Sequence, residues 1–190
     1  ITELIERMGT DNPVVRAVRN HDVCMVNPFT CKLLYKKAAL AVLSDERNED
    51  LYTADETAAI REHIPWTRVV EERTTTYKGL PVDLIPFITK YREQFVLKPN
   101  DDYGGRGIVL GWQTNAVGWE SALQTALEVP HVIQERVTIP NEPYPSLIDG
   151  KLQIYNRMLD TAPFTFHGEY TDGCLTRLSG SALLNVTAGT

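Results

Sequence analysis

The sequence predicts an α+β fold, in which a mainly helical first part, residues 1–92, is followed by a largely antiparallel sheet in residues 93–190. Apolar residues at helical spacing dominate the first part, whereas short apolar runs separated by Gly, Pro, Asp and Asn dominate the second. The predicted elements also occur in blocks and not as alternating strand–helix units. This order favours an α+β fold over a parallel α/β sheet.

In the first part, the clearest signal is a helix at residues 33–43, because the apolar residues of this segment recur on one helical face. The run VCMV within residues 21–27 predicts a short buried strand that a proline ends. The threonine-rich segment 74–80 predicts a small hairpin or loop. The other helices of this part are predicted at residues 2–8, 14–18, 54–63 and 82–91.

In the second part, two short apolar runs separated by glycines predict two strands, at residues 95–98 and 108–112. A helix is predicted at residues 119–127 and a further strand at 131–137. Residues 140–145 contain three prolines and predict a rigid loop. The remaining segments predict an antiparallel meander, with strands at 151–159, 164–170 and 174–178 and turns at 161–163 and 172–173.

Composition excludes several classes of protein. A chain of 190 residues with 43% apolar content can bury the core of one or two domains. The net charge of −6 argues against a nucleic-acid partner, and no apolar run reaches the roughly 18 residues of a membrane span. Three cysteines without CxxC spacing predict reduced thiols in a cytoplasmic protein, and four histidines scattered singly argue against a histidine-based metal cluster. Because the chain begins at Ile1 and not at Met, we expect a fragment truncated at both ends.

The stretch FVLKPNDDYGGRG, residues 95–107, carries the main functional signal. It places Gly104, Gly105 and Gly107 between two predicted strands, with Lys98 at the end of the first strand. Glycines remove side-chain bulk, so that backbone N–H groups can approach an anion closely, and the lysine adds a positive charge. Taken alone, the stretch fits a tight hairpin turn as well as a phosphate-binding flap.

Three better-known phosphate loops do not match this stretch. A P-loop requires GxxxxGK[ST], which is absent from the sequence. A dinucleotide-binding fingerprint requires a helix after the glycines, whereas the run Ile-Val-Leu that follows Gly107 predicts a strand. The glycine loop of protein kinases also joins two strands, but its lysine comes later in the chain, and no HRD or DFG motif follows here.

Four segments in order resemble the ATP-grasp superfamily, and specifically its circularly permuted members. These include eukaryotic-type glutathione synthetase, glutathionylspermidine synthase and uncharacterised bacterial proteins. The first segment is NPFTCKLLYKKAALAVLSD, residues 27–45. The resemblance implies that a lysine of this helix reaches the ATP phosphates, and Lys37 is the best match, with its neighbour Lys36 as the alternative. A solvated helix face would explain the same two lysines.

The second segment, FVLKPNDDYGGRGIVLG, is the most specific of the four. The resemblance implies that Lys98 contacts the α- and β-phosphates of ATP. It also implies that Asp102 binds magnesium, with Asp101 as the alternative; turn-capping aspartates are the other interpretation. The flap expected to close over the nucleotide consists of Tyr103, Gly104, Gly105, Arg106 and Gly107.

The third segment, HVIQERV, resembles the hinge strand whose backbone binds adenine, through Gln134, Glu135 and Arg136. The fourth, CLTRLSGSALLNVTAG, resembles a late strand and loop of the family. There the resemblance implies that Arg177 stabilises the transferred phosphoryl group as a catalytic residue. It also implies that Asn185 belongs to a loop of small residues with backbone donors for the nucleotide.

The resemblance implies an ATP-dependent carboxylate–amine ligase that acts through an acyl phosphate, with ATP and Mg²⁺ as cofactors and an unidentified carboxylate and amine as substrates. One departure from the family concerns the metal. An acidic pair that precedes the first lysine segment in the family has no counterpart before Lys37, so its ligands lie upstream of Ile1 or are lost. Another phosphoryl transferase and a non-catalytic ATP-binding module remain open as alternatives.

Overall fold

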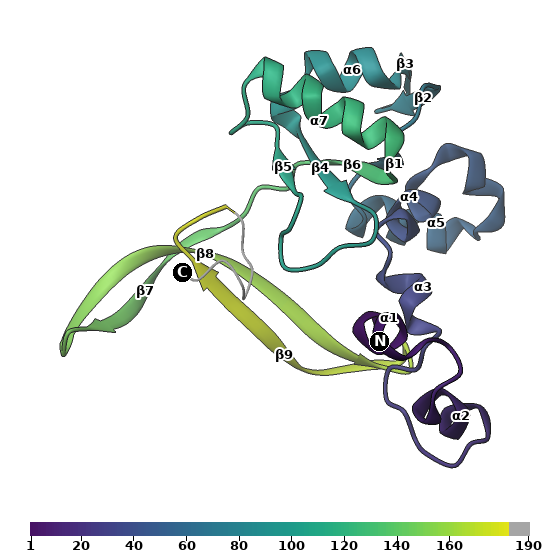
Figure 1. Ribbon diagram of the computed structural model, residues 1–190. Helices are drawn as coiled ribbons and strands as arrows, with labels where there is room; N and C mark the ends of the chain where they lie inside the picture. The colour runs from purple at the N-terminus through teal and green to yellow at the C-terminus, as the bar shows by residue number, and fades with distance from the viewer. Residues whose placement is uncertain (183–190) are drawn as a thin grey trace.

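The computed structural model describes residues 1–182 and has the predicted α+β fold, with helices and antiparallel sheets (Figure 1). No helix of this part of the chain is both long and apolar enough to cross a bilayer. The helical elements that precede the first strand are α1 (Thr2–Met8), α2 (Pro13–Arg19), α3 (Cys31–Tyr35), α4 (Ala38–Ser44), the 3₁₀ helix η1 (Glu46–Leu51) and α5 (Ala54–His63).

A four-stranded antiparallel sheet forms the centre of the molecule, in the order β1-β6-β4-β5. Because β1 comes from the first part of the chain and the other three strands from the second, the sheet crosses the predicted boundary at residue 92. The predicted hairpin at residues 74–80 is confirmed as a two-stranded sheet. The strands are β1 (Thr67–Val69), β6 (His131–Glu135), β4 (Phe95–Pro99) and β5 (Val109–Leu110) in the central sheet, and β2 (Thr74–Tyr77) and β3 (Leu80–Asp83) in the hairpin.

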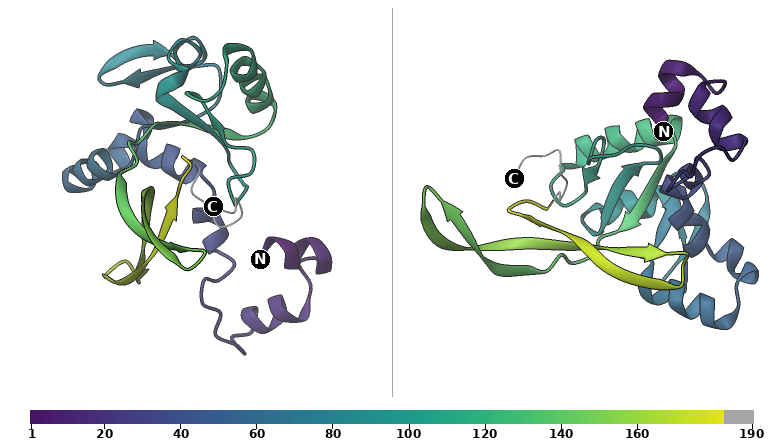
Figure 2. Two further views of the ribbon diagram at one scale, coloured as in Figure 1. Left: turned by 90° about the vertical axis from the view of Figure 1, so that its left-hand side faces the viewer. Right: turned by 90° about the horizontal axis from the view of Figure 1, so that it is seen from below.

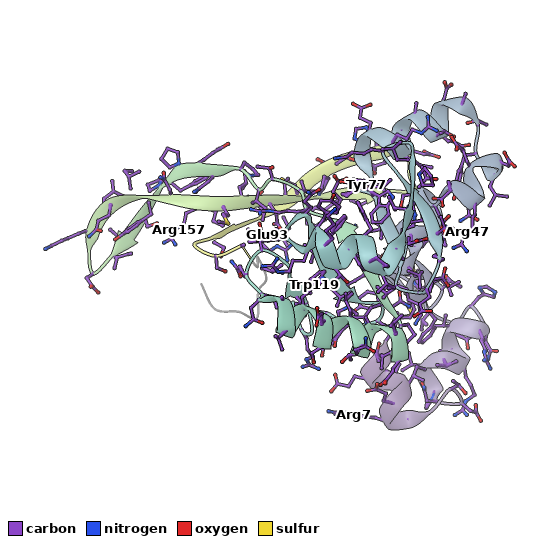
Figure 3. All side chains as sticks on the ribbon, turned by 90° about the horizontal axis from the view of Figure 1, so that it is seen from above. Arg7, Arg47, Tyr77, Glu93, Trp119 and Arg157 are labelled. Atoms are coloured by element: carbon purple, nitrogen blue, oxygen red, sulfur yellow. The ribbon has the colours of Figure 1, made fainter. Side chains whose placement is uncertain are left out.

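The hydrophobic core lies on one face of the central sheet. Helices α6 (Leu84–Lys90) and α7 (Ala116–Glu128) cover this face, and Trp119 of α7 is fully buried there (Figures 1 and 3). The core-facing strand residues include Phe95, Leu97 and Ile133. Because side chains alternate along a strand, the next residues of β4 and β6 point to the opposite face. The 3₁₀ helix η2 (Arg92–Gln94) leads directly into β4.

A second, three-stranded antiparallel sheet follows in the order β7-β8-β9, and its β7–β8 hairpin extends away from the rest of the molecule (Figures 1 and 2). Its strands are β7 (Asn141–Ile148), β8 (Lys151–Phe166) and β9 (Tyr170–Ser179). The loop predicted at residues 140–145 is therefore wrong. Pro143 and Pro145 belong to β7, which tolerates them because an edge strand leaves one row of backbone groups unpaired.

The turn predicted at residues 161–163 is also wrong. Strand β8 continues through Pro163, and a register shift between Pro163 and Thr165 accommodates the proline. The chain reverses at His167 and Gly168 instead, where φ is 54° and 73°. A glycine adopts this left-handed backbone without strain, which makes Gly168 the effective turn residue.

Two predictions for the first part fail as well. Residues 21–27 form turns and bends and not a strand, and Val26 is 84% exposed. The single helix predicted at residues 33–43 is broken into α3 and α4, because Lys36 has an extended backbone with ψ of 132°. As a result Leu33 and Leu34, which the helical pattern placed in a core, are exposed. Helices α5 and α7 are confirmed.

Candidate functional site

Two lysines meet on the face of the central sheet that the core helices leave uncovered. Lys98 lies near the end of β4, and Lys37 is the residue that precedes α4. Lys37 Nζ donates to the backbone oxygen of Asp102 at 2.6 Å, and Lys98 Nζ donates to Oε1 of Gln134 at 2.6 Å. Within residues 1–182, neither ammonium forms an ion pair with a carboxylate.

Burial lowers the pKa of both lysines. For Lys98 the largest cause is desolvation, and the positive charge of Lys37 lowers its pKa further. For Lys37 desolvation also dominates, although the nearby Asp102 and Asp101 act in the opposite direction. A lowered lysine pKa means that nearby negative groups do not fully offset the cost of burying the ammonium, so an anion in contact with these lysines would be stabilised.

The first half of the glycine-containing loop, residues 100–108, holds Lys37 in place. The backbone oxygen of Asn100 accepts from the Lys37 N–H at 3.0 Å, and its side-chain oxygen accepts from the Ala38 N–H at 2.8 Å. Asn100 therefore caps α4 from a position more than 60 residues away in sequence. These bonds explain why the predicted long helix is interrupted before Lys37.

Asp101 is bound to two other lysines. Its Oδ1 accepts from Lys32 Nζ and its Oδ2 accepts from Lys36 Nζ, each at 2.7 Å. These hydrogen bonds lower the pKa of Asp101 to about 2. Lys36 is thus bound to Asp101, and it is Lys37, the other candidate, that lies beside Lys98.

The loop itself joins two antiparallel strands, as the sequence predicts, since Val96 of β4 pairs with Leu110 of β5. Its glycines Gly104, Gly105 and Gly107 all have positive φ, between 65° and 75°. A Cβ atom on Gly107 would lie 2.7 Å from Cγ of Pro99, so this position requires glycine for space as well as for conformation. In Figure 1 the loop extends from the sheet towards α3.

The outer part of the loop carries the two remaining predicted flap residues. Tyr103 is 67% exposed, and the guanidinium of Arg106 lies 5.6 Å from its ring centroid. The backbone N–H of Arg106 donates to the Tyr103 oxygen at 3.3 Å, which closes a turn within the loop. The inner half of the loop is thus held by α3 and α4, whereas the outer half presents exposed side chains.

Asp102 offers one carboxylate near the two lysines. Its Oδ1 accepts from the N–H of Tyr103 at 2.8 Å, and the residue is half-buried. Among residues 1–182, no group of three or more His, Cys, Asp or Glu side chains could hold a metal ion. The residues present therefore fit a single ligand of a magnesium ion and do not form a protein-only site.

A cavity of about 370 Å³ adjoins Lys98, between the central sheet and the three-stranded sheet. Its polar groups include Lys98, Gln134 and Asp160. A volume in this range fits a drug-sized or nucleoside-sized ligand. Its walls are largely apolar and include Val96, Ile108, Leu110, Trp112, Val137 and Leu159.

A larger hollow, of about 820 Å³, lies beside α5 and shares Glu135 and Val137 with the smaller cavity. Neither Lys37 nor Lys98 lines it. Its charged wall includes Arg68, whose guanidinium donates to Glu46, Thr75 and backbone oxygens. The smaller cavity is therefore the candidate site, because Lys98 lines it.

The predicted hinge residues have protein partners. The N–H groups of Glu135 and Arg136 donate to the backbone oxygens of Trp66 and Gln94, both at 2.8 Å. The carboxylate of Glu135 accepts from Tyr77, and the guanidinium of Arg136 lies 4.1 Å from the centroid of the Trp112 ring. These two backbone donors are thus used within the protein. The Gln134 side chain, in contrast, faces Lys98.

Arg177 of β9 pairs with Asp160 of β8, directly opposite in the register. Its Nε donates to Asp160 Oδ1 at 2.9 Å and its Nη2 donates to Oδ2, and these hydrogen bonds raise the pKa of Arg177. Because Asp160 lines the same cavity as Lys98, Arg177 adjoins the site through its partner. Asn185 lies outside the described residues.

Sequence reasoning missed three of these residues: Asn100, Asp160 and the side-chain role of Gln134. Asn100 directly follows the Lys-Pro pair, and asparagine is a preferred helix cap, which is the one signal that could have identified it. Nothing local marks Asp160 or the amide of Gln134, because their partners come from other strands.

Comparison of the chain with protein-family models, with curated proteins and with solved structures gave no match. The function is therefore argued from the geometry of the site. That geometry combines two half-buried cations, a loop with three left-handed glycines and an apolar cavity.

Proposed function

We propose that this chain binds the phosphates of ATP through Lys37, Lys98 and the glycine-containing loop, in the manner of an ATP-grasp protein. The observation that carries the proposal is the pair of half-buried ammonium groups without a carboxylate partner in the described chain. Burial of an uncompensated charge is unfavourable, and an anionic phosphate would compensate both charges at once. The glycine loop supports the same ligand, since it allows close backbone approach beside Lys98.

The apolar cavity is the place that we assign to the adenine base. Its walls offer aliphatic side chains from both sheets, and Lys98 is one of the residues that line it. The N–H groups of Glu135 and Arg136 already donate to the protein. We therefore expect adenine to be read by the backbone beyond Arg136, where Val137 and Ile139 line the cavity.

The reaction that we propose is carboxylate–amine ligation, on the basis of the resemblance in four ordered segments. A substrate carboxylate oxygen bonds to the γ-phosphorus of ATP, and the bond from that phosphorus to ADP breaks. The amine nitrogen of the second substrate then bonds to the acyl carbon, releases inorganic phosphate and loses a proton. Lys37 and Lys98 would neutralise charge on the phosphates, and the loop would exclude water from the acyl phosphate.

Magnesium bound with the nucleotide would supply further positive charge, and Asp102 would provide one oxygen ligand.

One observation favours a second candidate, a module that binds ATP without catalysis. The guanidinium of Arg177, the predicted catalytic residue, is occupied by Asp160. For catalysis this guanidinium would have to contact the phosphoryl group as well as its present partner.

Titration with a non-hydrolysable ATP analogue in the presence of Mg²⁺ tests the nucleotide site. We expect Lys98→Ala to weaken binding by about tenfold or more, since one hydrogen bond between charged groups contributes roughly 1.5–3 kcal/mol. The matched control is Lys151→Ala, which removes an exposed lysine at the start of β8 and should bind like the wild type. Equal affinity of Lys98→Ala and the wild type would overturn the phosphate role of Lys98.

Turnover assays separate the candidate reactions. ATP hydrolysis or transfer is measured with a panel of carboxylic acids, with and without an amine, and hydroxylamine is added to trap an acyl phosphate as a hydroxamate. Hydroxamate and amide formation would support the ligase. A stable phosphorylated product without amide would contradict it, and binding without any turnover would favour the non-catalytic module.

A further inference from the structure

The side chain of Gln134 lies between Thr67 and Lys98, on three neighbouring strands of the central sheet. In the register, Gln134 of β6 is paired with Thr67 of β1 on one side and with Val96 of β4 on the other. Gln134 Nε2 donates to Thr67 Oγ1 at 2.9 Å, and Gln134 Oε1 accepts from Lys98 Nζ at 2.6 Å. Thr67 is fully buried and Gln134 is 7% exposed, so the bond between them is sheltered from water, whereas Lys98 is half-buried and lines the cavity.

The hydrogen bonds fix the orientation of this amide. The Thr67 hydroxyl donates its proton to the backbone oxygen of Pro65 at 2.7 Å, so towards Gln134 it can act only as an acceptor. Gln134 must therefore present its NH₂ group to Thr67 and its carbonyl oxygen to Lys98. The opposite orientation would place the NH₂ group against the Lys98 ammonium and leave the carbonyl facing a hydroxyl that has no proton to donate.

We propose that Gln134 is a positioning residue: its amide, oriented by Thr67, holds the Lys98 ammonium beside the cavity without neutralising its charge. This inference rests on the proposed function, because the charge kept free is the one offered to a phosphate. A neutral acceptor and a carboxylate could hold the ammonium equally well by geometry. Only the neutral acceptor leaves the full positive charge for an anionic ligand, and the same chain uses a carboxylate where lysines are neutralised, at Asp101.

The first test compares Thr67→Val with Thr67→Ser. Valine removes the acceptor that orients the amide, whereas serine keeps a hydroxyl at the same place. We expect Thr67→Val to weaken binding of the ATP analogue by about tenfold, because the amide that it no longer orients would fail to hold Lys98, whose hydrogen bond to a phosphate joins two charged groups. Thr67→Ser should bind within about twofold of the wild type, a difference too small to reflect a lost hydrogen bond. Equal losses in both variants would overturn the proposal.

The second test compares Gln134→Glu with Gln134→Leu and measures the pKa of Lys98 by NMR of the isotope-labelled lysine side chain, assigned with Lys98→Arg. Glutamate keeps an acceptor but adds a negative charge, so the pKa of Lys98 should rise and the affinity for the ATP analogue should fall. In Gln134→Leu, which has no acceptor, the affinity should also fall, whereas the pKa of Lys98 should not rise. Unchanged Lys98 pKa and affinity in Gln134→Glu would overturn the proposal.

Two controls keep the outcome interpretable. Thermal denaturation identifies a variant that fails to fold, and the double variant Thr67→Val/Gln134→Leu should lose no more affinity than Gln134→Leu alone, because both changes break one chain of hydrogen bonds. The NMR measurement does not require nucleotide. If the wild type binds no ATP analogue, the proposed function fails. If the pKa of Lys98 does not respond to Gln134→Glu, the proposed positioning role of Gln134 fails.

Discussion

Two groups of buried or half-buried charges in this protein differ in whether they form ion pairs. In the paired cluster, Arg68 donates to Glu46 at 2.6 Å, and Arg73 donates to Asp45 at 2.6 Å and to Glu46 at 2.8 Å. Burial alone would raise the pKa of Asp45, but hydrogen bonds from Arg73 and Arg47 lower it well below its ordinary value. In the lysine pair, the hydrogen bonds of the ammonium groups go to an amide oxygen and a backbone oxygen, and within residues 1–182 neither ammonium forms an ion pair with a carboxylate.

The difference separates charges that stabilise the fold from charges that, in the function we propose, bind a ligand. The paired cluster ties the segment that follows α4 to the β2–β3 hairpin, since Glu46 also accepts from Thr75 at 2.9 Å. The arginines of the paired cluster are balanced by carboxylates, so the cluster needs no ligand. The lysine pair is incomplete, which costs stability and is typical of binding sites. Four predictions sharpen this comparison, beginning with the largest expected effect.

Arg68→Met should lower the free energy of unfolding by about 3 kcal/mol, because it removes the most deeply buried cation of the cluster and leaves Arg73 as the arginine that pairs with Glu46. The side chain of Arg68 is 3% exposed in this ion pair. The matched control is Arg7→Met, which breaks the exposed pair with Glu3 at the edge of the molecule (Figure 3) and should cost less than about 1 kcal/mol. Urea denaturation measures both. Similar losses would show that the cluster is not a stabilising network.

The fold was predictable where the signal is local. Helix α5 begins with a complete capping box between Thr53 and Glu56, and α7 carries its buried residues at helical spacing. The break between α3 and α4 was not predictable, because the cap that causes it, Asn100, comes from a distant loop. Strand β8 likewise continues through Pro163 because of pairing with β9, which the local turn signal does not contain.

The same division applies to the site. Lys98 and its glycine loop form one continuous stretch and could be identified as a candidate before the structure was known. The partners that give these residues their properties are long-range: Gln134 for Lys98 and Asp160 for Arg177. Sequence spacing identifies residue types in an order, whereas the tertiary structure decides which charges are compensated.

Gly107→Ala should destabilise the protein by about 1–2 kcal/mol or more, since an L-residue at positive φ is strained. Here φ is 69° and the new Cβ would also approach Cγ of Pro99 to 2.7 Å. Gly79→Ala is the matched control, because φ is 81° but no atom lies within 4 Å of its new Cβ. Thermal denaturation of both variants isolates the effect of the close contact. An equal loss in the two would mean that the loop can move away from Pro99.

Lys98→Met should leave stability unchanged or raise it by up to about 1 kcal/mol, while binding of the ATP analogue falls, as expected when a functional charge is replaced. Water in the adjoining cavity can replace the bond to Gln134. Because the pKa of Lys98 is lowered from 10.5 in the folded state, the unfolded chain binds the proton more tightly, and wild-type stability should rise as the pH passes from the lowered pKa to 10.5. Any stability advantage of Lys98→Met over the wild type should therefore shrink as the pH rises over that range. A clear loss of stability at pH 7 would contradict this account.

Asp101→Asn should have the smallest effect, because its ion pairs with Lys32 and Lys36 are partly exposed and such pairs contribute at most about 1 kcal/mol. Its pKa is lowered from 3.8 to about 2 in the folded state, so the contribution is fully present above 3.8 and is lost as the pH falls through about 2. The difference in unfolding free energy between the wild type and Asp101→Asn should thus disappear as the pH falls from about 4 to about 2, whereas the difference for Lys98→Met shrinks as the pH rises. In both cases the wild type gains stability as the pH rises. Asp172→Asn, at an exposed position of β9, is the control for a surface substitution and should change the free energy of unfolding by less than about 0.5 kcal/mol at pH 7. If the difference between the wild type and Asp101→Asn does not change in acid, Asp101 does not neutralise Lys32 and Lys36 in solution, and those lysines would join Lys37 and Lys98 as available cations.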